Sequence, residues 1–481
     1  MTSQQLAVTL TGLRRQITSG ACTAAEALQL QQQTLFKYAQ RWKCVTHTFP
    51  LSATTDSTLP LAGVGLAHKD IFAMRGHLPE CGTAHTQSLP RTSATVIRRL
   101  ERAGSHPLAA LSMAEFACGV TGENPNLPLP VNPIDPIAAV GGSSSGSAVA
   151  VAAGLCYGSL GTDTAGSIRI PAATCGVLGL KPTTGLLPTT GSYPLAANLD
   201  TIGILARSAL DAAQIFSAVL LPAQRKRLLP GFIPTTGSPN QINWHQLQVG
   251  LAAPPQWRIA TCFSHFQTAF TPDESHTEQL YQFAKSCANK APIARIELSA
   301  AMPELIRYAN IVLHVEAAAV HSKAMLKQAP KLSDITRAVT LSGAAIPAIW
   351  YHSALKDRHS HAQTFVNSYL RDHDILLTPV LPQGVPDWDS VLTQSPGFQP
   401  RTLLGLFSWT AFINYLGLPA IVFPIGQDKQ GRPVCIQAIA RPHAEALLLA
   451  LAYETERDRF GMNGFIERPP ALRPQPSTLK K

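Results

Sequence analysis

Serine and lysine side chains in three stretches of the chain could carry out nucleophilic chemistry. Residues 141–147 (GGSSSGS) and 162–167 (TDTAGS) are hydroxyl-rich and lie on either side of an apolar run at 148–155. The third stretch, GVGLAHKDIFAM, holds Lys69 among mostly apolar residues. Burial disfavours the charged form of a lysine, so a buried Lys69 could act as a general base. Paired with a serine, it would form a Ser-Lys nucleophile that needs no histidine.

Two opposite charges accompany the serine-rich region. Asp163 and Arg169 are the only charged residues between Gly141 and Leu180. An unpaired charge is costly to bury in an apolar segment, so we expect these two side chains to pair with each other. Such an ion pair would fix the turn that carries Ser167.

Residues 141–147 also allow three other interpretations. A Gly/Ser linker would not be followed by a candidate buried helix. A phosphate-binding loop would require lysine after its second glycine, where Ser147 stands. Residues 142–146 match the G-x-S-x-G nucleophile elbow of α/β-hydrolases, which would make Ser144 the nucleophile. An elbow follows a firm strand, however, and the preceding NPIDPIAAV contains two prolines.

The composition indicates a folded protein with a large core. The 481 residues are 45% hydrophobic and 14% charged, which excludes a disordered chain, and the length alone suggests two or three domains. The net charge is +10, but the densest basic run is RKR at 225–227, so we expect a basic surface without a nucleic-acid role.

The cysteines and the N-terminal residues bear on the compartment. Nine cysteines are scattered without a CxxC motif, which is typical of reduced thiols in a cytosolic protein. The N-terminal MTSQQLAVTL does not resemble a secretory signal, and no apolar stretch reaches eighteen residues. We therefore expect a soluble cytoplasmic protein that does not bind membranes.

Helical patterns alternate with short apolar runs, which predicts an α/β protein. We divide the chain into an N-terminal helical segment at 1–60, a main domain at 61–460 and a loosely ordered tail at 461–481. The patterns predict helices at 5–40 (two, broken at Gly20), 92–103, 148–155, 208–220, 275–289, 301–327, 403–415 and 443–457, and strands at 63–72, 107–111, 247–252, 374–379, 420–425 and 434–440.

Several motifs together resemble the amidase signature family. They are GLAHKD (65–70), NPIDP (132–136), GGSSSGSAVAVAAG (141–154), GTDTAGSIRIPA (161–172), LGLKPT (178–183), DILLTPVLP (374–382), LGLPAIVFPIG (416–426) and RPHAEALLLALAYE (441–454). The resemblance spans about 61–460. It implies a large mixed central β-sheet flanked by helices on both faces, and an amidohydrolase that uses neither a cofactor nor a metal.

The resemblance also implies a role for three residues. Ser167 would be the nucleophile, Ser143 the bridging residue after a cis peptide bond, and Lys69 the terminal base. Protons would pass from Ser167 through Ser143 to neutral Lys69 as Ser167 attacks the amide carbonyl. The same relay would return a proton to the leaving amine, and water would then hydrolyse the acyl-enzyme.

The oxyanion of the tetrahedral intermediate needs preorganised donors. On the family pattern these are backbone N–H groups of Thr164, Ala165, Gly166 and Ser167. The family commonly has glycine at the position of Ala165. A positive φ would strain alanine there, so we expect a backbone geometry that alanine tolerates.

The remaining polar residues of this region have supporting roles in this interpretation. Asp163 and Arg169 would form the scaffold of the turn. Ser144 and Ser145 would form hydrogen bonds within their loop instead of reacting, although the family commonly has glycine at position 145.

The substrate pocket is expected between residues around 113–124, the helices at 305–355 and the loop and helix at 385–412. Arg307, His321 and Arg337 could meet an anionic substrate, or they could form a solvated helix face. The aromatic and histidine side chains of these parts, which could belong to the pocket or to the core, are Tyr308, His314, Trp350, Tyr351, Phe407 and Trp409.

The preferred function is a stand-alone amidase acting on a small amide or ureide-like compound, with a homodimer left open. The alternative within the family is the glutamine amidotransferase subunit that supplies ammonia to misacylated tRNA. The net charge favours that subunit slightly, but residues 300–371 do not resemble its glutamine-binding stretch. An inert binding protein on the same scaffold would have no chemical need for Lys69, Ser143 and Ser167.

Overall fold

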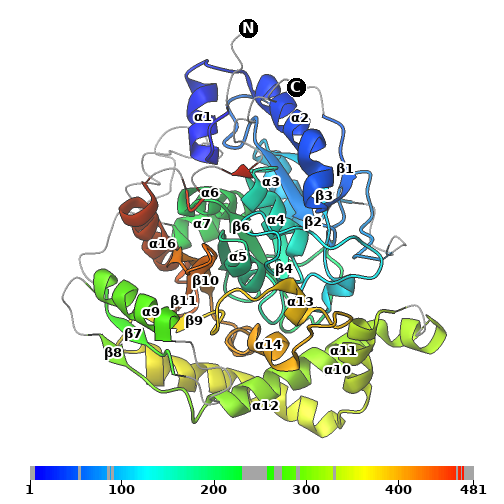
Figure 1. Ribbon diagram of the computed structural model, residues 1–481, viewed down its shortest axis with the longest axis vertical. Helices are drawn as coiled ribbons and strands as arrows, with labels where there is room; N and C mark the ends of the chain where they lie inside the picture. Colours follow the sequence, from blue (N-terminus) through cyan, green and yellow to red (C-terminus); the bar gives the residue numbers. More distant parts are fainter. Residues whose placement is uncertain are drawn as a thin grey trace.

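An eight-stranded mixed β-sheet lies at the centre of the computed structural model (Figure 1). The structure describes residues 6–51, 56–83, 87, 92–229, 257–264, 274–288, 293–328, 332–461, 464–466 and 469–470, and of 323–328 the backbone only. Neighbouring strands are antiparallel from β4 to β9, and β7 and β8 continue parallel to β9. In spatial order the strands are β4 (Gly158–Asp163), β6 (Thr201–Ala206), β5 (Leu178–Lys181), β10 (Ala420–Gln427), β11 (Pro433–Ile439), β9 (Ile375–Pro379), β7 (Ile259–Thr261) and β8 (Ala294–Arg295).

A second, three-stranded sheet carries the first reactive candidate. Its order is β1 (Val45–Thr48), β3 (His106–Leu111) and β2 (Gly65–Lys69), with β2 parallel to β3. A Cβ on Gly65 would lie 2.4 Å from Leu108 Cδ1, so a larger residue there would force the Leu108 side chain to move. Strand β2 also contacts β4 of the large sheet, where the N–H of Leu160 donates to Nδ1 of His68 at 3.1 Å.

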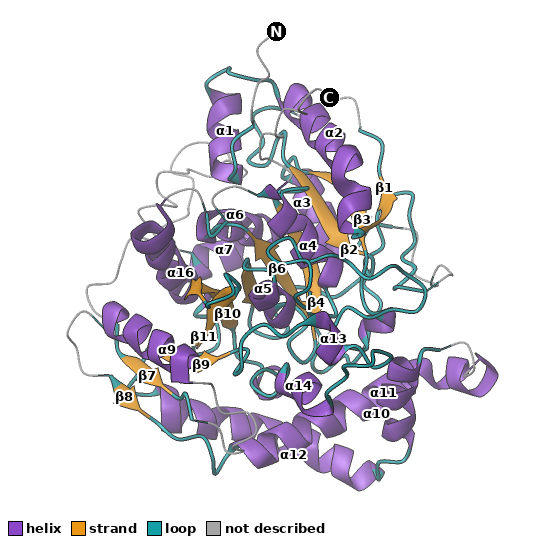
Figure 2. Cartoon of the chain, in the orientation of Figure 1, coloured by secondary structure: helices purple, strands orange, loops and turns teal. Residues whose placement is uncertain are grey.

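Helices surround both sheets (Figure 2). Besides its α-helices, the structure has a 3₁₀ turn at Glu115–Ala117 and a π-helical turn at Val366–Leu370. The helices are α1 (Leu10–Thr18), α2 (Ala24–Trp42), α3 (Thr95–Arg102), α4 (Ser145–Ala153), α5 (Arg169–Thr174), α6 (Ala209–Val219), α7 (Pro222–Leu228), α9 (Glu274–Cys287), α10 (Met302–Gln328), α11 (Asp334–Ala344), α12 (Ala348–Phe365), α13 (Trp388–Val391), α14 (Pro400–Gly405), α15 (Ala411–Leu416) and α16 (Glu445–Phe460).

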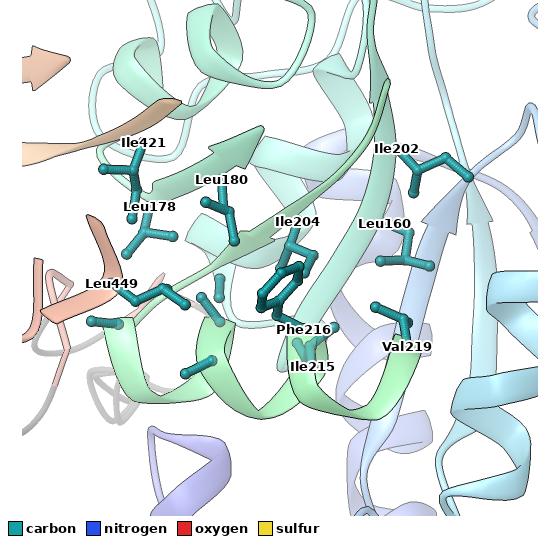
Figure 3. Packing of buried hydrophobic residues seen from close by; sticks show 14 of the residues in the cluster. Leu160, Leu178, Leu180, Ile202, Ile204, Ile215, Phe216, Val219, Ile421 and Leu449 are labelled. Carbon is teal, nitrogen blue, oxygen red and sulfur yellow. The ribbon is translucent and has the colours of Figure 1, made fainter. Parts of the chain in front are cut away.

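The large sheet buries both of its faces. Leu180 and Ile204 belong to the same core cluster as Phe216 of α6, and Figure 3 shows the Phe216 ring beside Ile204. The next residue, Leu205, belongs to a different cluster with α4 and α5, because successive strand side chains point to opposite faces. Every residue of α4 is buried, as expected for a helix that is small and apolar on all sides. The predicted mixed sheet with helices on both faces is therefore confirmed.

The helices α10, α11 and α12 form a layer at the bottom of Figure 1. Helix α10 contacts α11, α12 and α15, and α15 links this layer to the central sheet through the cluster that contains Ile413 and Ile439. None of the helices in the described part of the chain combines the length and hydropathy needed to span a membrane.

Most predicted elements are present, with bounds shifted by a few residues. Residues 403–415 were predicted as one helix, which is wrong: α14 and α15 are separated by a turn whose Thr410 Oγ1 donates to the carbonyl of Ala165 at 2.5 Å. The predicted loose tail is wrong at its start, since Phe465 and Ile466 are buried against the core. The predicted strand at 247–252 lies outside the described residues.

Candidate active site

Lys69 is the last residue of β2 and has no solvent exposure. Its Nζ lies 2.7 Å from Ser143 Oγ and 2.9 Å from Thr162 Oγ1. Burial lowers the pKa of Lys69 to about 7, although the nearby carboxylate of Asp200 acts in the opposite direction. A substantial fraction of Lys69 is therefore neutral near pH 7 and able to accept a proton.

Ser143 is held next to this amine by its backbone. The Gly142–Ser143 peptide bond is cis, as the family resemblance implied. The carbonyl of Ser143 accepts a hydrogen bond from the N–H of Ala114 at 3.2 Å, and the side chain is fully buried. Ser143 therefore has no direct access to solvent, and its hydroxyl faces the lysine.

Ser167 lies in the turn after β4, beside the Ser143 loop. The N–H of Ser144 donates to the carbonyl of Ser167 at 3.2 Å, which brings the two turns together. Ser167 also lines a cavity, whereas Ser143 and Lys69 do not. The structure thus joins Lys69 and Ser143 by a side-chain hydrogen bond, and joins Ser167 to the next residue of that loop through the backbone.

The turn around Ser167 is fixed by a buried ion pair. Arg169 donates through Nε and an Nη atom to both oxygens of Asp163, at 3.1 and 2.9 Å, and neither side chain is exposed. Burial alone would raise the pKa of Asp163, but the Arg169 charge and its hydrogen bonds hold that pKa well below its ordinary value. The predicted pairing of these two residues is confirmed.

The same carboxylate engages one of the four amides that were predicted as oxyanion donors. The N–H of Gly166 donates to Asp163 Oδ1 at 2.8 Å, so this amide is already used by the scaffold. No acceptor among the described residues takes the N–H groups of Thr164, Ala165 or Ser167. Gly166 has a φ of +125°, whereas Ala165 is not among the residues with positive φ, which confirms the expectation that alanine is tolerated there.

The neighbouring serines do not resemble a nucleophile elbow. Ser144 is fully buried and donates to the carbonyl of Thr162 at 3.3 Å, as predicted for a hydrogen bond within this region. Residues 137–142 contribute only an isolated bridge, from Ala138, and no strand. The elbow interpretation is therefore wrong. Ser145 Oγ has no hydrogen-bond partner among the described residues, contrary to expectation.

The sequence patterns did not indicate that Asp200 belongs to the site. Its Oδ1 accepts from Thr164 Oγ1 at 2.6 Å, and its Oδ2 accepts from the N–H groups of Leu195 and Ala196 at 2.9 and 3.2 Å. Burial raises the pKa of Asp200 to about 6. The antiparallel register that pairs Asp163 with Thr201 brings Asp200 to the turn. Asp200 is a single charged residue directly before an apolar strand. An isolated charge in an apolar segment is the same signal that indicated a structural role for Asp163.

A cavity of about 220 Å³ opens beside Ser167. It is lined by residues from the three predicted segments, at 117–121, 310–339 and 393–407, together with Leu195 and the 164–167 turn. Leu404, at its edge, is 48% exposed. The cavity therefore extends from Ser167 to the exposed side chain of Leu404 on α14.

Only two of the six aromatic and histidine candidates line this cavity, namely His314 and Phe407. Trp409 is buried in the core, Trp350 is 55% exposed, Tyr308 stacks on His361 and Tyr351 donates to Glu316.

None of the three basic candidates, Arg307, His321 and Arg337, lines the cavity. Arg307 and Arg337 are solvated and pair with acidic residues on their own helices, as a helix face would. His321 differs from both, because it is buried against the Phe116 ring.

The described part of the chain contains no group of three or more His, Cys, Asp or Glu residues that could hold a metal ion.

The chain is similar over most of its length to known proteins. The family model described as Amidase matches residues 27–449. Putative amidase AmiD of Mycobacterium tuberculosis (strain ATCC 25618 / H37Rv) is 32% identical over 426 residues, covering 86% of this chain and 82% of that protein. One of the subunits of the glutamyl-tRNA(Gln) amidotransferase of Prochlorococcus marinus (strain MIT 9211) is 30% identical over 426 residues, covering 83% and 84%. A solved crystal structure of an amidase superposes with a TM-score of 0.77 at 27% identity, covering 94% of this chain and 99% of that one.

Proposed function

The chain belongs to the amidase family, and on that premise we propose that it hydrolyses the amide bond of a small molecule through an acyl-enzyme on Ser167. It is an amidohydrolase of non-peptide C–N bonds, and the proposal concerns which residues perform the reaction. The observation that carries it is the 2.7 Å contact between Lys69 Nζ and Ser143 Oγ, in a fully buried setting next to the turn of Ser167.

The reaction begins with proton transfer along the buried relay. Neutral Lys69 accepts the proton of Ser143, and Ser143 accepts the proton of Ser167 as its Oγ attacks the amide carbonyl. The backbone N–H groups of Thr164, Ala165 and Ser167 stabilise the oxyanion, and the loss of one such donor typically costs about 10²–10³-fold in rate. Asp163 and Arg169 keep these amides in place.

The second half of the reaction reverses the relay. Protonated Lys69 returns a proton through Ser143 to the leaving nitrogen, and the amine departs. Water then enters, loses a proton to the same relay and attacks the acyl ester of Ser167. The products are a carboxylic acid and an amine or ammonia, and the enzyme regains its starting protonation state.

Labelling with a fluorophosphonate tests the nucleophile directly. Mass spectrometry of the labelled protein should locate the adduct on Ser167, and Ser167→Ala should abolish both the adduct and amide turnover. Ser144→Ala is the matched control, because Ser144 is a neighbouring serine that the relay does not use. Labelling lost in Ser144→Ala and kept in Ser167→Ala would contradict the assignment.

Two observations favour a second candidate, the glutamine amidotransferase subunit. They are the 30% identity to the Prochlorococcus marinus protein and the net charge of +10. The purified chain alone should release amine or ammonia from small amides under the first proposal. Glutaminase activity that appears only with partner subunits and tRNA would favour the second.

We also propose a cytoplasmic location. All nine cysteines are free, and eight of them are buried, which suits a reducing compartment. Cell fractionation followed by immunodetection tests this, and enrichment outside the cytoplasmic fraction would contradict it.

A further inference from the structure

We infer that the cavity beside Ser167 binds an uncharged, apolar acyl group, so that the substrates are neutral amides of aliphatic or arylalkyl carboxylic acids. This inference rests on Ser167 as the nucleophile. It excludes amides whose acyl part carries a carboxylate or an ammonium group, glutamine among them.

The charge of the cavity wall is the first observation. Among the described residues that line it, none is Asp, Glu, Lys or Arg. Most of the wall is apolar: Leu313 comes from α10, Val339 from α11 and Phe407 from the turn between α14 and α15. A charged group placed here would lose its water without gaining an ion-pair partner, and that loss is costly.

Two acidic residues close to the wall, Glu123 and Glu115, already form hydrogen bonds with their surroundings. Glu123 accepts hydrogen bonds from the N–H and the hydroxyl of Thr393, at 3.0 Å each. Glu115 accepts from the N–H of Ser333 at 2.8 Å and from the amide of Asn126 at 3.2 Å. These carboxylates fasten the cavity wall to its surroundings, and neither of them lines the cavity.

His314 is the imidazole on the wall, and its orientation is set by the backbone. Its Nδ1 lies 2.8 Å from the carbonyl of Val339, and a carbonyl can only accept, so Nδ1 carries the proton. In the neutral ring Nε2 is then an acceptor.

The position of the cavity assigns it to the acyl group. Thr164, Ala165 and Ser167 form one part of the wall, so the space begins at the atom that would carry the acyl group. The acyl group stays covalently attached while the amine leaves and water replaces it. An apolar space next to Ser167 suits the part that stays, and exposed Leu404 marks the side open to solvent.

The volume sets the size of that group. A cavity of about 150 Å³ accommodates benzene. The 220 Å³ available here therefore fits a phenyl ring with one or two methylenes, or an unbranched chain of about six carbons. Burying each added methylene favours binding about four-fold, so four methylenes give on the order of 10²-fold.

A series of primary amides tests the inference. We expect kcat/KM to rise on the order of 10²-fold from acetamide to hexanamide. Phenylacetamide should equal or exceed hexanamide. The monoamide of adipic acid and 6-aminohexanamide, which place a carboxylate or an ammonium at the end of the chain, should fall at least about 10²-fold below hexanamide. A flat series, or charged amides that match hexanamide, would overturn the inference.

A pair of variants on α11 sharpens the test. Val339→Asp places a carboxylate on the cavity wall, and it should lower kcat/KM for hexanamide by at least about 30-fold while favouring 6-aminohexanamide over it. Leu341→Asp adds the same charge to the same helix at a side chain that is 50% exposed and outside the cavity, so it should leave the preference unchanged. Equal behaviour of the two variants would count against the cavity.

Two measurements separate this inference from the proposed function. Calorimetric binding to the Ser167→Ala variant should favour hexanamide over its charged analogues without any turnover. Acetamide hydrolysis and labelling of Ser167 by a small methylphosphonofluoridate report the chemistry alone. If both occur without a preference for neutral acyl groups, the inference fails and the proposed function stands. If neither occurs, both fail.

Discussion

Two buried lysines in this molecule have similar protonation properties and different connections. Lys69 ends β2 and Lys181 ends β5, and neither side chain is exposed. Burial lowers the pKa of each to about 7. The Nζ of Lys69 contacts the hydroxyls of Ser143 and Thr162, whereas the Nζ of Lys181 donates to the carbonyl of Pro182 at 2.8 Å.

The difference shows what a buried lysine needs in order to act as a base. A carbonyl oxygen carries no proton, so Lys181 has nothing to accept from its partner. Ser143 carries a proton and lies beside the turn that opens into the cavity. A lowered pKa therefore marks both lysines as candidates, and only the hydrogen-bond partners favour Lys69 as the proposed base.

The largest expected effect separates the two lysines directly. Lys69→Met should lower kcat by about 10⁴-fold or more, because the relay loses its terminal acceptor. Lys181→Met replaces the same buried amine with a side chain of similar length, and we expect it to keep kcat within about ten-fold of the wild type. Steady-state kinetics on a neutral amide, with circular dichroism to check folding, makes the comparison. Retained activity in Lys69→Met, or equal losses in both variants, would contradict it.

The pH dependence gives the next largest effect. Lys69 must be neutral to accept a proton, so kcat/KM should fall as the pH drops through about 7, by about ten-fold for each further unit. The acid limb should persist in Lys181→Met, since that lysine is not on the proton path. A profile that stays flat between pH 5 and 8 in the wild type would remove Lys69 from the relay.

A smaller effect is expected from Asp200, a positioning residue that holds Thr164 and Leu195. Asp200→Asn keeps the size of the side chain and removes its charge, and we expect kcat to fall by about 10–30-fold. The Asp200 charge raises the pKa of Lys69, so its removal should also shift the acid limb to lower pH. A purely structural role would lower kcat without moving the limb, and the pH profile distinguishes the two.

Local sequence determined the parts of the site that were predicted correctly. Asp163 and Arg169 are six residues apart in an otherwise uncharged segment, so their pairing followed from the cost of burying either charge alone. The fold class followed from short apolar runs alternating with helices. The three segments that line the cavity came from the family resemblance.

Long-range packing decided what was missed. Asp200 reaches the turn through the register of β6 on β4, which no local pattern specifies. Whether Tyr308 and Trp409 belong to the core or to the pocket depends on how α10 packs against α15. The N–H of Gly166 is taken by a carboxylate three residues earlier, a detail of turn geometry that residue types do not reveal.

The contact between β2 and β4 has a consequence for how activity relates to stability. Lys69 belongs to the three-stranded sheet, and Thr162 and the Ser167 turn belong to the eight-stranded one. The proposed proton path thus crosses the contact between two separately hydrogen-bonded sheets, which the Leu160 amide and the His68 imidazole join nearby. A shift of one sheet against the other would stop amide turnover while leaving the hydrogen bonds within each sheet intact. The rate of turnover would therefore report on how well the two sheets stay in contact.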